Sequence, residues 1–213
     1  KLWKLRASRY WTISPFPAPL GPATPKIMRA RYRVPPTAVK TNRRIARALR
    51  CGHRSVSLLA MHVFVTGAAG FVGGHLLSRL EAAGNRVTAT DREVDVTDPR
   101  SLGAAIRDAQ PEAIVHLAAQ SSVQASYEDP ADAFRINYLG TLTLLRVVAS
   151  DAPGARVLLV GSSDAYGSTG AGASPIRESD PLAPESPYAR SKAAAEFLGG
   201  LAAERGLDVI RVR

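Results

Sequence analysis

Apolar and polar residues follow a regular order from residue 61 to the end of the 213-residue chain. Short runs rich in β-branched residues, which favour strands, alternate with longer stretches in which apolar residues recur every three or four positions, as in helices. The expected strands are 61–66, 86–90, 93–96, 113–119, 156–163 and 208–213, and the expected helices are 71–84, 98–110, 131–150 and 187–205. This alternation predicts a doubly wound α/β fold, Rossmann-like, with a parallel sheet covered on both faces. Ligands of such folds bind at the carboxyl ends of the strands.

Capping residues mark the start of two of these helices. Asp98 and Pro99 open one of them, and Ser186 and Pro187 open the last one. An Asp or Ser side chain accepts a hydrogen bond from a free backbone N–H group at a helix start. Proline is favourable at the first helical position, because the N–H group that it lacks would have no partner within the helix. Both helices are therefore expected to begin at these residues.

Residues 1–60 lack a sustained helical or strand period until about residue 42, and they are rich in proline and arginine. They hold 14 Lys and Arg residues and no Asp or Glu, so a disordered basic tail is expected. Three interpretations stay open. In the first, the segment is not native protein, because the start of the gene is assigned too early and Met61, directly before the first strand, is the true start. In the second, it is a targeting peptide. In the third, it is a basic arm that binds nucleic acid or anionic lipid.

The net charge of +10 comes entirely from this tail, because residues 61–213 hold 14 basic and 18 acidic residues and carry a net charge of −4. Nucleic-acid binding by the domain 61–213 is therefore not expected. The single cysteine, Cys51, also lies in the tail. The domain thus has no disulfide framework, no metal site is expected, and a reducing, cytoplasmic location is indicated. No apolar run reaches the roughly 18 residues of a membrane span.

A glycine-rich turn joins the first expected strand to the first expected helix. It places Gly67, Gly70 and Gly73 in a G-x-x-G-x-x-G spacing. Glycines at such a turn allow backbone N–H groups to approach a pyrophosphate closely, and the positive end of the following helix stabilises the anion. The turn therefore predicts dinucleotide binding, although a purely structural turn is the alternative.

An acidic residue at the end of the second strand indicates which dinucleotide is bound. Asp91 lies about 20 residues beyond the turn, where a carboxylate can accept hydrogen bonds from both ribose hydroxyls and repel a 2′-phosphate. This favours NAD. The adjacent Arg92 can bind a 2′-phosphate, so NADP stays possible.

The last helix carries a tyrosine and a lysine four residues apart. Tyr188 and Lys192 share one face of the helix, and Tyr188 lies in its first turn, where the helix dipole favours negative charge. A phenol beside a lysine ammonium can take a proton from a sugar hydroxyl as hydride leaves, or return one as hydride arrives. The spacing alone occurs often by chance, but the dinucleotide turn in the same domain gives it weight.

Five motifs in order, "TGAAGFVG", "HLAAQSSV", "NYLGTLTLL", "GSSDAYG" and "SPYARSKAAAE", resemble the extended short-chain dehydrogenase/reductases, the NAD-dependent epimerase/dehydratase family. The resemblance covers residues 61–213. It is strongest to the GDP-mannose 4,6-dehydratases and to the GDP-4-keto-6-deoxy-mannose reductases. It implies an NAD(P)-dependent enzyme acting on a GDP-linked nucleotide sugar, and a homodimer when complete. A nucleotide-sugar 4-epimerase and a non-catalytic dinucleotide-binding protein are the alternatives.

The resemblance also implies a role for individual positions. The pyrophosphate is expected to contact Gly67, Gly70, Phe71 and Val72, and the ribose is expected to contact Asp91. Adenine is expected to contact Asp95 and Val96. The nicotinamide is expected to lie along Leu117, Ala118 and Ala119. Ser162, Tyr188 and Lys192 form the catalytic set, with Ser162 bonded to the reacting C4 oxygen. Ser121 and Ser122 are expected to touch substrate, unless they only cap a helix. A structural role is implied for Asn137.

Asp164 is where dehydratase and reductase differ. Dehydratases of the family carry a glutamate at this position, which removes the C5 proton while water leaves C6. Aspartate is one methylene shorter, so its reach falls short by about 1–1.5 Å, the length of a carbon–carbon bond, whereas a general base works at about 2.6–3.2 Å. A dehydratase with Asp164 as the assisting acid is the first interpretation, and a reductase the second.

Members of the family continue past the "IRVR" strand with a domain that holds the sugar nucleotide. The resemblance therefore implies that residues 61–213 are a truncated dinucleotide-binding domain without its C-terminal substrate domain, and that this piece alone is inactive.

Overall fold

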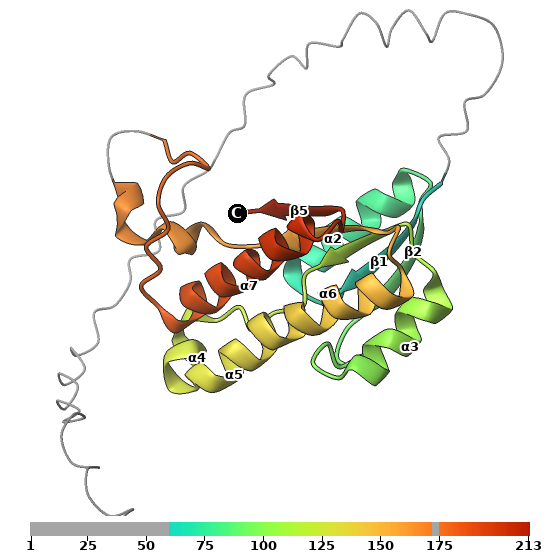
Figure 1. The fold of residues 1–213 in the computed structure, drawn as a ribbon, viewed down its shortest axis with the longest axis horizontal. Coiled ribbons are helices and arrows are strands. Elements are labelled where there is room, and N and C mark those ends of the chain that lie inside the picture. The colour runs from blue at the N-terminus through green and yellow to red at the C-terminus, as the bar shows by residue number, and fades with distance from the viewer. Residues whose placement is uncertain (1–59, 172–174) are drawn as a thin grey trace, which may run out of the picture. The chain divides into compact units, whose positions relative to one another are not determined.

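The computed structural model describes residues 60–171 and 175–213 (Figure 1). The expectations for the basic tail fall on residues 1–59, outside the described part. Five parallel strands form one sheet in the order β2-β1-β3-β4-β5. Their bounds are His62–Thr66 (β1), Arg86–Thr90 (β2), Ala113–His116 (β3), Arg156–Val160 (β4) and Val209–Val212 (β5). The doubly wound fold expected from the sequence is confirmed.

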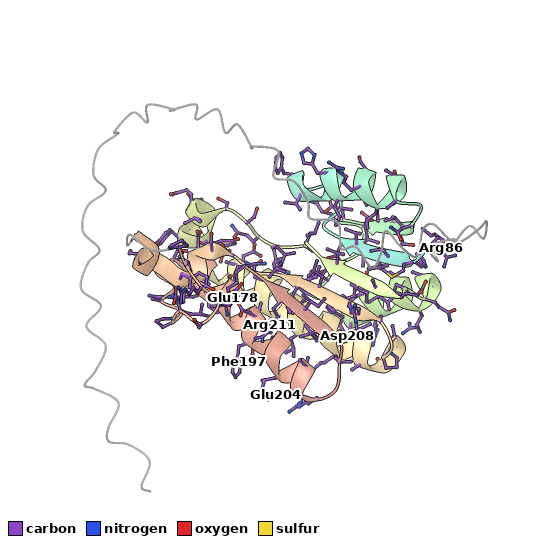
Figure 2. All side chains as sticks on the ribbon, turned by 90° about the horizontal axis from the view of Figure 1, so that it is seen from above. Arg86, Glu178, Phe197, Glu204, Asp208 and Arg211 are labelled. Atoms are coloured by element: carbon purple, nitrogen blue, oxygen red, sulfur yellow. The ribbon has the colours of Figure 1, made fainter. Side chains whose placement is uncertain are left out.

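The helices lie on the two faces of this sheet. Their bounds are Phe71–Ala82 (α2), Pro99–Ala109 (α3), Val123–Glu128 (α4), Pro130–Phe134 (α5), the π-helical turn Arg135–Leu139 (η1), Gly140–Asp151 (α6), the 3-10 segment Ser163–Ala171 (η2) and Pro187–Glu204 (α7). Figure 2 shows α2 on one side of the sheet and α7 on the other. Within the described part of the chain, no helix combines the length and the apolar character needed to cross a membrane.

The larger core lies between the sheet and the layer of α3, α6 and α7. Phe64 of β1 and Ile114 of β3 are fully buried against Leu102 and Ile106 of α3 and Leu144 of α6. Burying one such side chain stabilises the fold by roughly 1.5–3 kcal/mol. These residues are apolar positions of the expected strands and helices. The periodicity of the sequence therefore predicted the buried side of these elements correctly.

The opposite face is only partly covered. Helix α2 packs there on β1 and β3 through Leu76, Leu77 and Leu80, but no described helix covers the outer part of the sheet. Ile210 and Val212 of β5 remain 43% and 39% exposed. Full cover on both faces was expected, and over the described residues this expectation holds for one face only.

Several expected elements differ in the structure. Residues 93–96 form turns instead of a strand, because Glu93 accepts a hydrogen bond from the backbone N–H of Asp91 (2.7 Å) and Val94 N–H donates to the Asp91 carbonyl (3.1 Å). These local bonds use groups that a strand would need. Strands β3 and β4 end at His116 and Val160, earlier than expected. After β3 the apolar residues Leu117, Ala118 and Ala119 continue and line a groove, whereas β4 is followed by Gly161, Ser162 and Ser163.

The long helix expected at 131–150 is present but interrupted. The chain forms α5, then one π-helical turn, then α6. Helices α4 and η2 were not expected, since both are short and carry no repeated apolar pattern. A π turn inserts an extra residue into a helix and shifts the face that follows, and such turns are frequent at functional sites.

Adjacent glycines in α2 provide a test of the packing of the glycine turn. A Cβ on Gly73 would lie 2.2 Å from the carbonyl oxygen of Ala68, whereas a Cβ on Gly74 would meet nothing within 4 Å. We expect Gly73→Ala to destabilise the protein by about 1–3 kcal/mol. Gly74→Ala should stabilise it by about 0.5–1 kcal/mol, because alanine has the better helix propensity. Urea denaturation measures both changes, and equal effects of the two variants would contradict this account of the turn.

Candidate functional site

A groove of about 690 Å³ opens at the carboxyl ends of β1, β2 and β3. The chain passes from β1 to β2 on one side and later returns to β3 on the other side of β1, so the groove lies where the strand order reverses. Ligands of doubly wound folds bind at this point. Its lining includes Gly67, Gly70, Phe71, Val72, Gly73, Asp91, Arg92, Asp95, Val96, Leu117, Ala118, Ala119 and Ser121. The residues predicted for the cofactor, apart from Tyr188 and Lys192, are thus brought together in one groove.

At Gly67 the glycine turn approaches the segment after β3 too closely for a side chain. Gly67 has φ +69°, and a Cβ there would lie 2.6 Å from the backbone nitrogen of Ala118. Gly70 precedes the first residue of α2 and provides no side-chain cap, so the helix start is left without a side-chain acceptor. The free N–H groups and the positive end of α2 suit an anion such as a pyrophosphate. The turn therefore fits the group predicted for it.

Charged side chains form the rim of the groove beyond β2. Asp91 is partly buried, and Arg92 and Glu93 are exposed. The hydrogen bond from the Asp91 backbone N–H lowers the pKa of Glu93, so that carboxylate stays ionised. Two acidic side chains, Asp91 and Asp95, and two basic ones, Arg92 and Arg135, thus line the groove, and Glu93 adjoins Asp91.

Helix α7 presents the Tyr-x-x-x-Lys pair. The predicted cap is confirmed, since Ser186 Oγ accepts from Ala189 N–H at 3.0 Å and Pro187 is the first helical residue. The backbone N–H of Tyr188 donates to Ser126 Oγ at 3.1 Å, and Ser126 is fully buried in α4. The start of α7 is therefore fixed against α4.

Lys192 reaches the end of β4. Its Nζ donates to the Val160 carbonyl at 2.5 Å. Burial lowers the pKa of Lys192 to about 8, so the ammonium is still the main form at neutral pH. Val160 lies two residues before Ser162, so this bond joins the Tyr-x-x-x-Lys helix to the strand end that carries the candidate serine.

Ser162 and Asp164 lie just beyond that strand end. The Asp164 backbone N–H donates to Ser162 Oγ at 3.2 Å, and the side chain of Asp164 is exposed. Because β4 ends at Val160, strand alternation does not govern the direction of Ser163, and this residue instead begins η2. Ser162 and Asp164 are thus neighbours at the same edge of the sheet as the groove.

Contacts with the segment before α7 hold η2 in place. Ala183 N–H donates to the Ala165 carbonyl at 2.9 Å, and Ser168 donates through its backbone and its hydroxyl to Glu185. Gly167 has φ +59°, and a Cβ there would lie 2.1 Å from the Ala183 carbonyl oxygen. Tyr166 is buried, as expected of a packing residue, and its hydroxyl also accepts from Arg213. The loop next to Ser162 is therefore well anchored.

Asn137 links the groove to α7. Its Oδ1 accepts from Gln120 N–H at 2.8 Å, and its Nδ2 donates to the Gln120 carbonyl at 3.0 Å and to Ser191 Oγ at 2.9 Å. The residue is 2% exposed and lies in the π turn. The structural role expected of Asn137 is consistent with these three bonds, which connect the segment after β3 to the helix of Tyr188 and Lys192.

The two serines predicted for substrate differ in their surroundings. Ser122 Oγ accepts from Ala125 N–H at 3.1 Å and caps α4, which is the structural alternative considered for it. Ser121 is exposed and lines the groove. A substrate contact for either serine stays a prediction.

Three residues near the site were not singled out from the sequence. Ser126 holds the start of α7, while His116 and Glu196 are buried beside Lys192. Only Glu196 had a sequence signal, because it stands four residues after Lys192 and eight after Tyr188, on the same face of the helix. The other two depend on contacts between distant segments.

The architecture defines a Rossmann-like α/β protein with a glycine turn, and comparison with known proteins names its family. Residues 63–213 match the NAD dependent epimerase/dehydratase family. The chain therefore belongs to this family, as the resemblance implied.

The relatives that the chain matches are named for different reactions. The chain is 39% identical over 142 residues to the GDP-6-deoxy-D-mannose reductase of Pseudomonas aeruginosa, covering 66% of this chain and 46% of the relative. Among solved structures it resembles RMD from Pseudomonas aeruginosa complexed with NADPH (TM-score 0.65, 37% identity, 72% of this chain and 52% of that one). It also resembles the UDP-glucose 4-epimerase of Thermus thermophilus in complex with NAD (TM-score 0.63, 34% identity, 72% and 54%). The chain spans about half the length of the proteins it matches.

Proposed function

We propose that this protein transfers hydride between a nicotinamide dinucleotide and C4 of a nucleotide sugar. The observation that carries the proposal is the bond from Lys192 Nζ to the Val160 carbonyl. It joins the helix of Tyr188 to the strand end of Ser162, beside the groove whose glycine turn fits a pyrophosphate. A non-catalytic dinucleotide-binding protein would need the groove and the turn, but not a serine, a tyrosine and a lysine on two elements that this bond joins.

Each side chain has a role in the proposed reaction. A bound nicotinamide supplies or accepts the hydride. The Tyr188 phenol gives a proton to the C4 oxygen when hydride arrives, or takes it when hydride leaves. The Lys192 ammonium stabilises the phenolate and can bind ribose hydroxyls. The Ser162 hydroxyl bonds the reacting C4 oxygen and stabilises the charge that develops there.

The rim of the groove favours NAD as the dinucleotide. Asp91 lines the groove and would accept hydrogen bonds from ribose hydroxyls. The ionised Glu93, which accepts from the Asp91 backbone N–H, adds a second negative charge nearby. A 2′-phosphate would meet both carboxylates, opposed by the cation of Arg92. Arg135 also lines the groove, but it forms an ion pair with Asp132. NADP stays the alternative, since RMD from Pseudomonas aeruginosa was solved with NADPH.

A 4-keto-reductase acting on a GDP-linked sugar is the first candidate for the overall reaction, and this reverses the order suggested by the sequence. The chain is similar to a GDP-6-deoxy-D-mannose reductase, and Asp164 is one methylene shorter than the glutamate that elimination requires. A 4,6-dehydratase is the second candidate, favoured by the exposed carboxylate of Asp164 next to Ser162. Both reactions use the same hydride step at C4.

The preference for NAD is tested by binding to the 213-residue chain. In Asp91→Ala the ribose loses its acceptor, so we expect NAD⁺ affinity to fall by about tenfold, the effect of one hydrogen bond to a charged group. NADP⁺ affinity should stay equal or rise, because the repulsion is removed. Arg92→Ala is the matched control and should weaken NADP⁺ more than NAD⁺. Isothermal titration calorimetry measures these constants, and a parallel loss for both nucleotides in Asp91→Ala would contradict the assignment.

The hydride step is tested with Tyr188→Phe in the protein expressed from its complete open reading frame. Loss of the phenolic proton should lower kcat by at least about 10²-fold, while NAD(P) affinity changes less than about threefold. Nicotinamide absorbance follows the reaction. Tyr166→Phe serves as the control, because Tyr166 is buried in η2 and has no role in proton transfer. Near-normal turnover by Tyr188→Phe would refute the role of Tyr188.

The two candidate reactions are separated with Asp164→Asn in the same protein. If the protein is a reductase, Asp164→Asn should reduce a GDP-4-keto-6-deoxy sugar at a rate within about threefold of the unaltered protein. If it is a dehydratase, the unaltered protein converts GDP-mannose to a 4-keto-6-deoxy product, and Asp164→Asn loses this activity by about 10²-fold or more. Mass spectrometry of the products measures both. If the unaltered protein fails with both substrates, the proposed sugar is overturned.

A further inference from the structure

A buried histidine next to Lys192 has no part in the proposed reaction. His116 ends β3 and is 5% exposed. Its Nδ1 lies 2.8 Å from Oγ1 of Thr66, which is fully buried at the end of β1. Its Nε2 is buried and has no hydrogen-bond partner among the described residues. A buried polar atom without a partner is costly, so an unpartnered nitrogen at this position calls for a ligand.

The hydrogen bonds around Thr66 determine which ring nitrogen of His116 carries the proton. Thr66 Oγ1 accepts a hydrogen bond from Ala118 N–H at 3.3 Å. The described residues offer the hydroxyl hydrogen no acceptor other than His116 Nδ1. Burial lowers the pKa of His116 to about 3, and the charge of Lys192 acts in the same direction, so the ring is neutral. Nε2 of a neutral ring whose Nδ1 accepts is a donor.

A small cavity of about 10 Å³ is lined in part by His116. Its polar walls come from three elements: His116 on β3, Thr141 on α6, and Lys192 and Glu196 on α7. The Thr141 hydroxyl is already used, since it donates to the Asn137 carbonyl at 2.7 Å. A cavity of this size holds about one water molecule, provided that two to four polar groups face it.

Lys192 and Glu196 both have hydrogen-bonding capacity left. The Lys192 ammonium has three hydrogens, and one of them bonds the Val160 carbonyl. Glu196 is 7% exposed, and its two oxygens accept from Arg213 at 2.5 and 2.8 Å. A carboxylate has about four acceptor positions, so it can accept a further bond. Two donors, His116 and Lys192, and one acceptor, Glu196, thus line one cavity.

We propose that this cavity binds one water molecule, which accepts hydrogen bonds from His116 Nε2 and Lys192 Nζ and donates one to the Glu196 carboxylate. Three bonds are the usual number for a buried water. The water connects the Lys192 ammonium to the Glu196–Arg213 ion pair without direct contact, and it ties α7 to β3. His116 is therefore a positioning residue, because it acts on Lys192 through the water.

Two measurements on the unaltered 213-residue chain test the water site without any turnover. A high-resolution crystal structure should show one ordered water at about 2.7–3.2 Å from His116 Nε2 and from Lys192 Nζ. Long-range ¹⁵N NMR should show the Nε2–H tautomer of His116, uncharged at neutral pH. A direct contact of Nε2 with Glu196, a cavity without water density, or the Nδ1–H tautomer would each overturn the proposal.

Three variants test the effect on Lys192. His116→Leu removes the donor, His116→Gln retains a donor near the Nε2 position, and His62→Leu removes an equally buried histidine at the opposite end of the sheet. The water should be lost only in His116→Leu. NAD⁺ affinity should fall by about tenfold in that variant and by less than about threefold in the other two. Equal losses in His116→Leu and His62→Leu would show a merely structural role for His116.

The affinity measurement rests on the proposed function, because it assumes that Lys192 binds the dinucleotide. The crystallographic and NMR measurements do not. If the unaltered chain binds no dinucleotide but shows the water, the proposed function fails and the water site stands. If the unaltered chain binds dinucleotide but shows no water, the water site fails and the proposed function is unaffected.

Discussion

The side chain of Asn137 makes the contacts on which the rest of the candidate site depends. Its amide binds both backbone groups of Gln120 and the hydroxyl of Ser191. Gln120 belongs to the segment that lines the groove, and Ser191 precedes Lys192 on α7. One buried amide therefore sets the position of the Tyr-x-x-x-Lys helix relative to the groove. Leaving these partners unpaired in the interior would cost about 1–3 kcal/mol for each group.

The π turn explains how Asn137 reaches both partners. Helices α5 and α6 continue one another, and the turn Arg135–Leu139 shifts the face that follows it. Such a turn sacrifices regular helical hydrogen bonds. Here the Thr141 hydroxyl bonds the Asn137 carbonyl at 2.7 Å, and the contacts of the Asn137 side chain offset the loss. The π turn thus gives the Asn137 side chain a position that a continuous α-helix would not give it.

The interior beside Lys192 is unusually polar for a parallel sheet. His116, Lys192 and Glu196 are all largely removed from solvent, and Arg213 forms an ion pair with Glu196. Buried charges are tolerated when they are paired and hydrogen-bonded. Burial also lowers the pKa of Lys192 to about 8, so the same environment that holds the ammonium brings it closer to exchanging its proton. The same buried environment therefore determines both the position and the proton affinity of Lys192.

Much of the fold could be predicted from the sequence, because helices and strands follow local periodicity. Strand β2, helix α3 and the caps Asp98 and Ser186 were found from their own residues. The expected strand at 93–96 was wrong, because a side-chain bond from Glu93 to the backbone competes with strand pairing. The end of β3 was placed too late, since the apolar residues Leu117, Ala118 and Ala119, which line the groove, look like strand residues. The end of β4 was also placed too late, by Gly161, Ser162 and Ser163, which carry no strand signal of their own. The short elements α4 and η2 carry too few residues for a period.

The sequence by itself determined the alternation of strands and helices, the glycine turn and the spacing of Tyr188 and Lys192, because each depends on residues close together in the chain. Only the tertiary structure decided what these residues meet. Lys192 bonds a carbonyl 32 positions away, and Asn137 bonds a serine 54 positions away. The buried place of His116 likewise depends on neighbouring strands. Such contacts form when segments distant in the chain pack together, and no local pattern of residues encodes them.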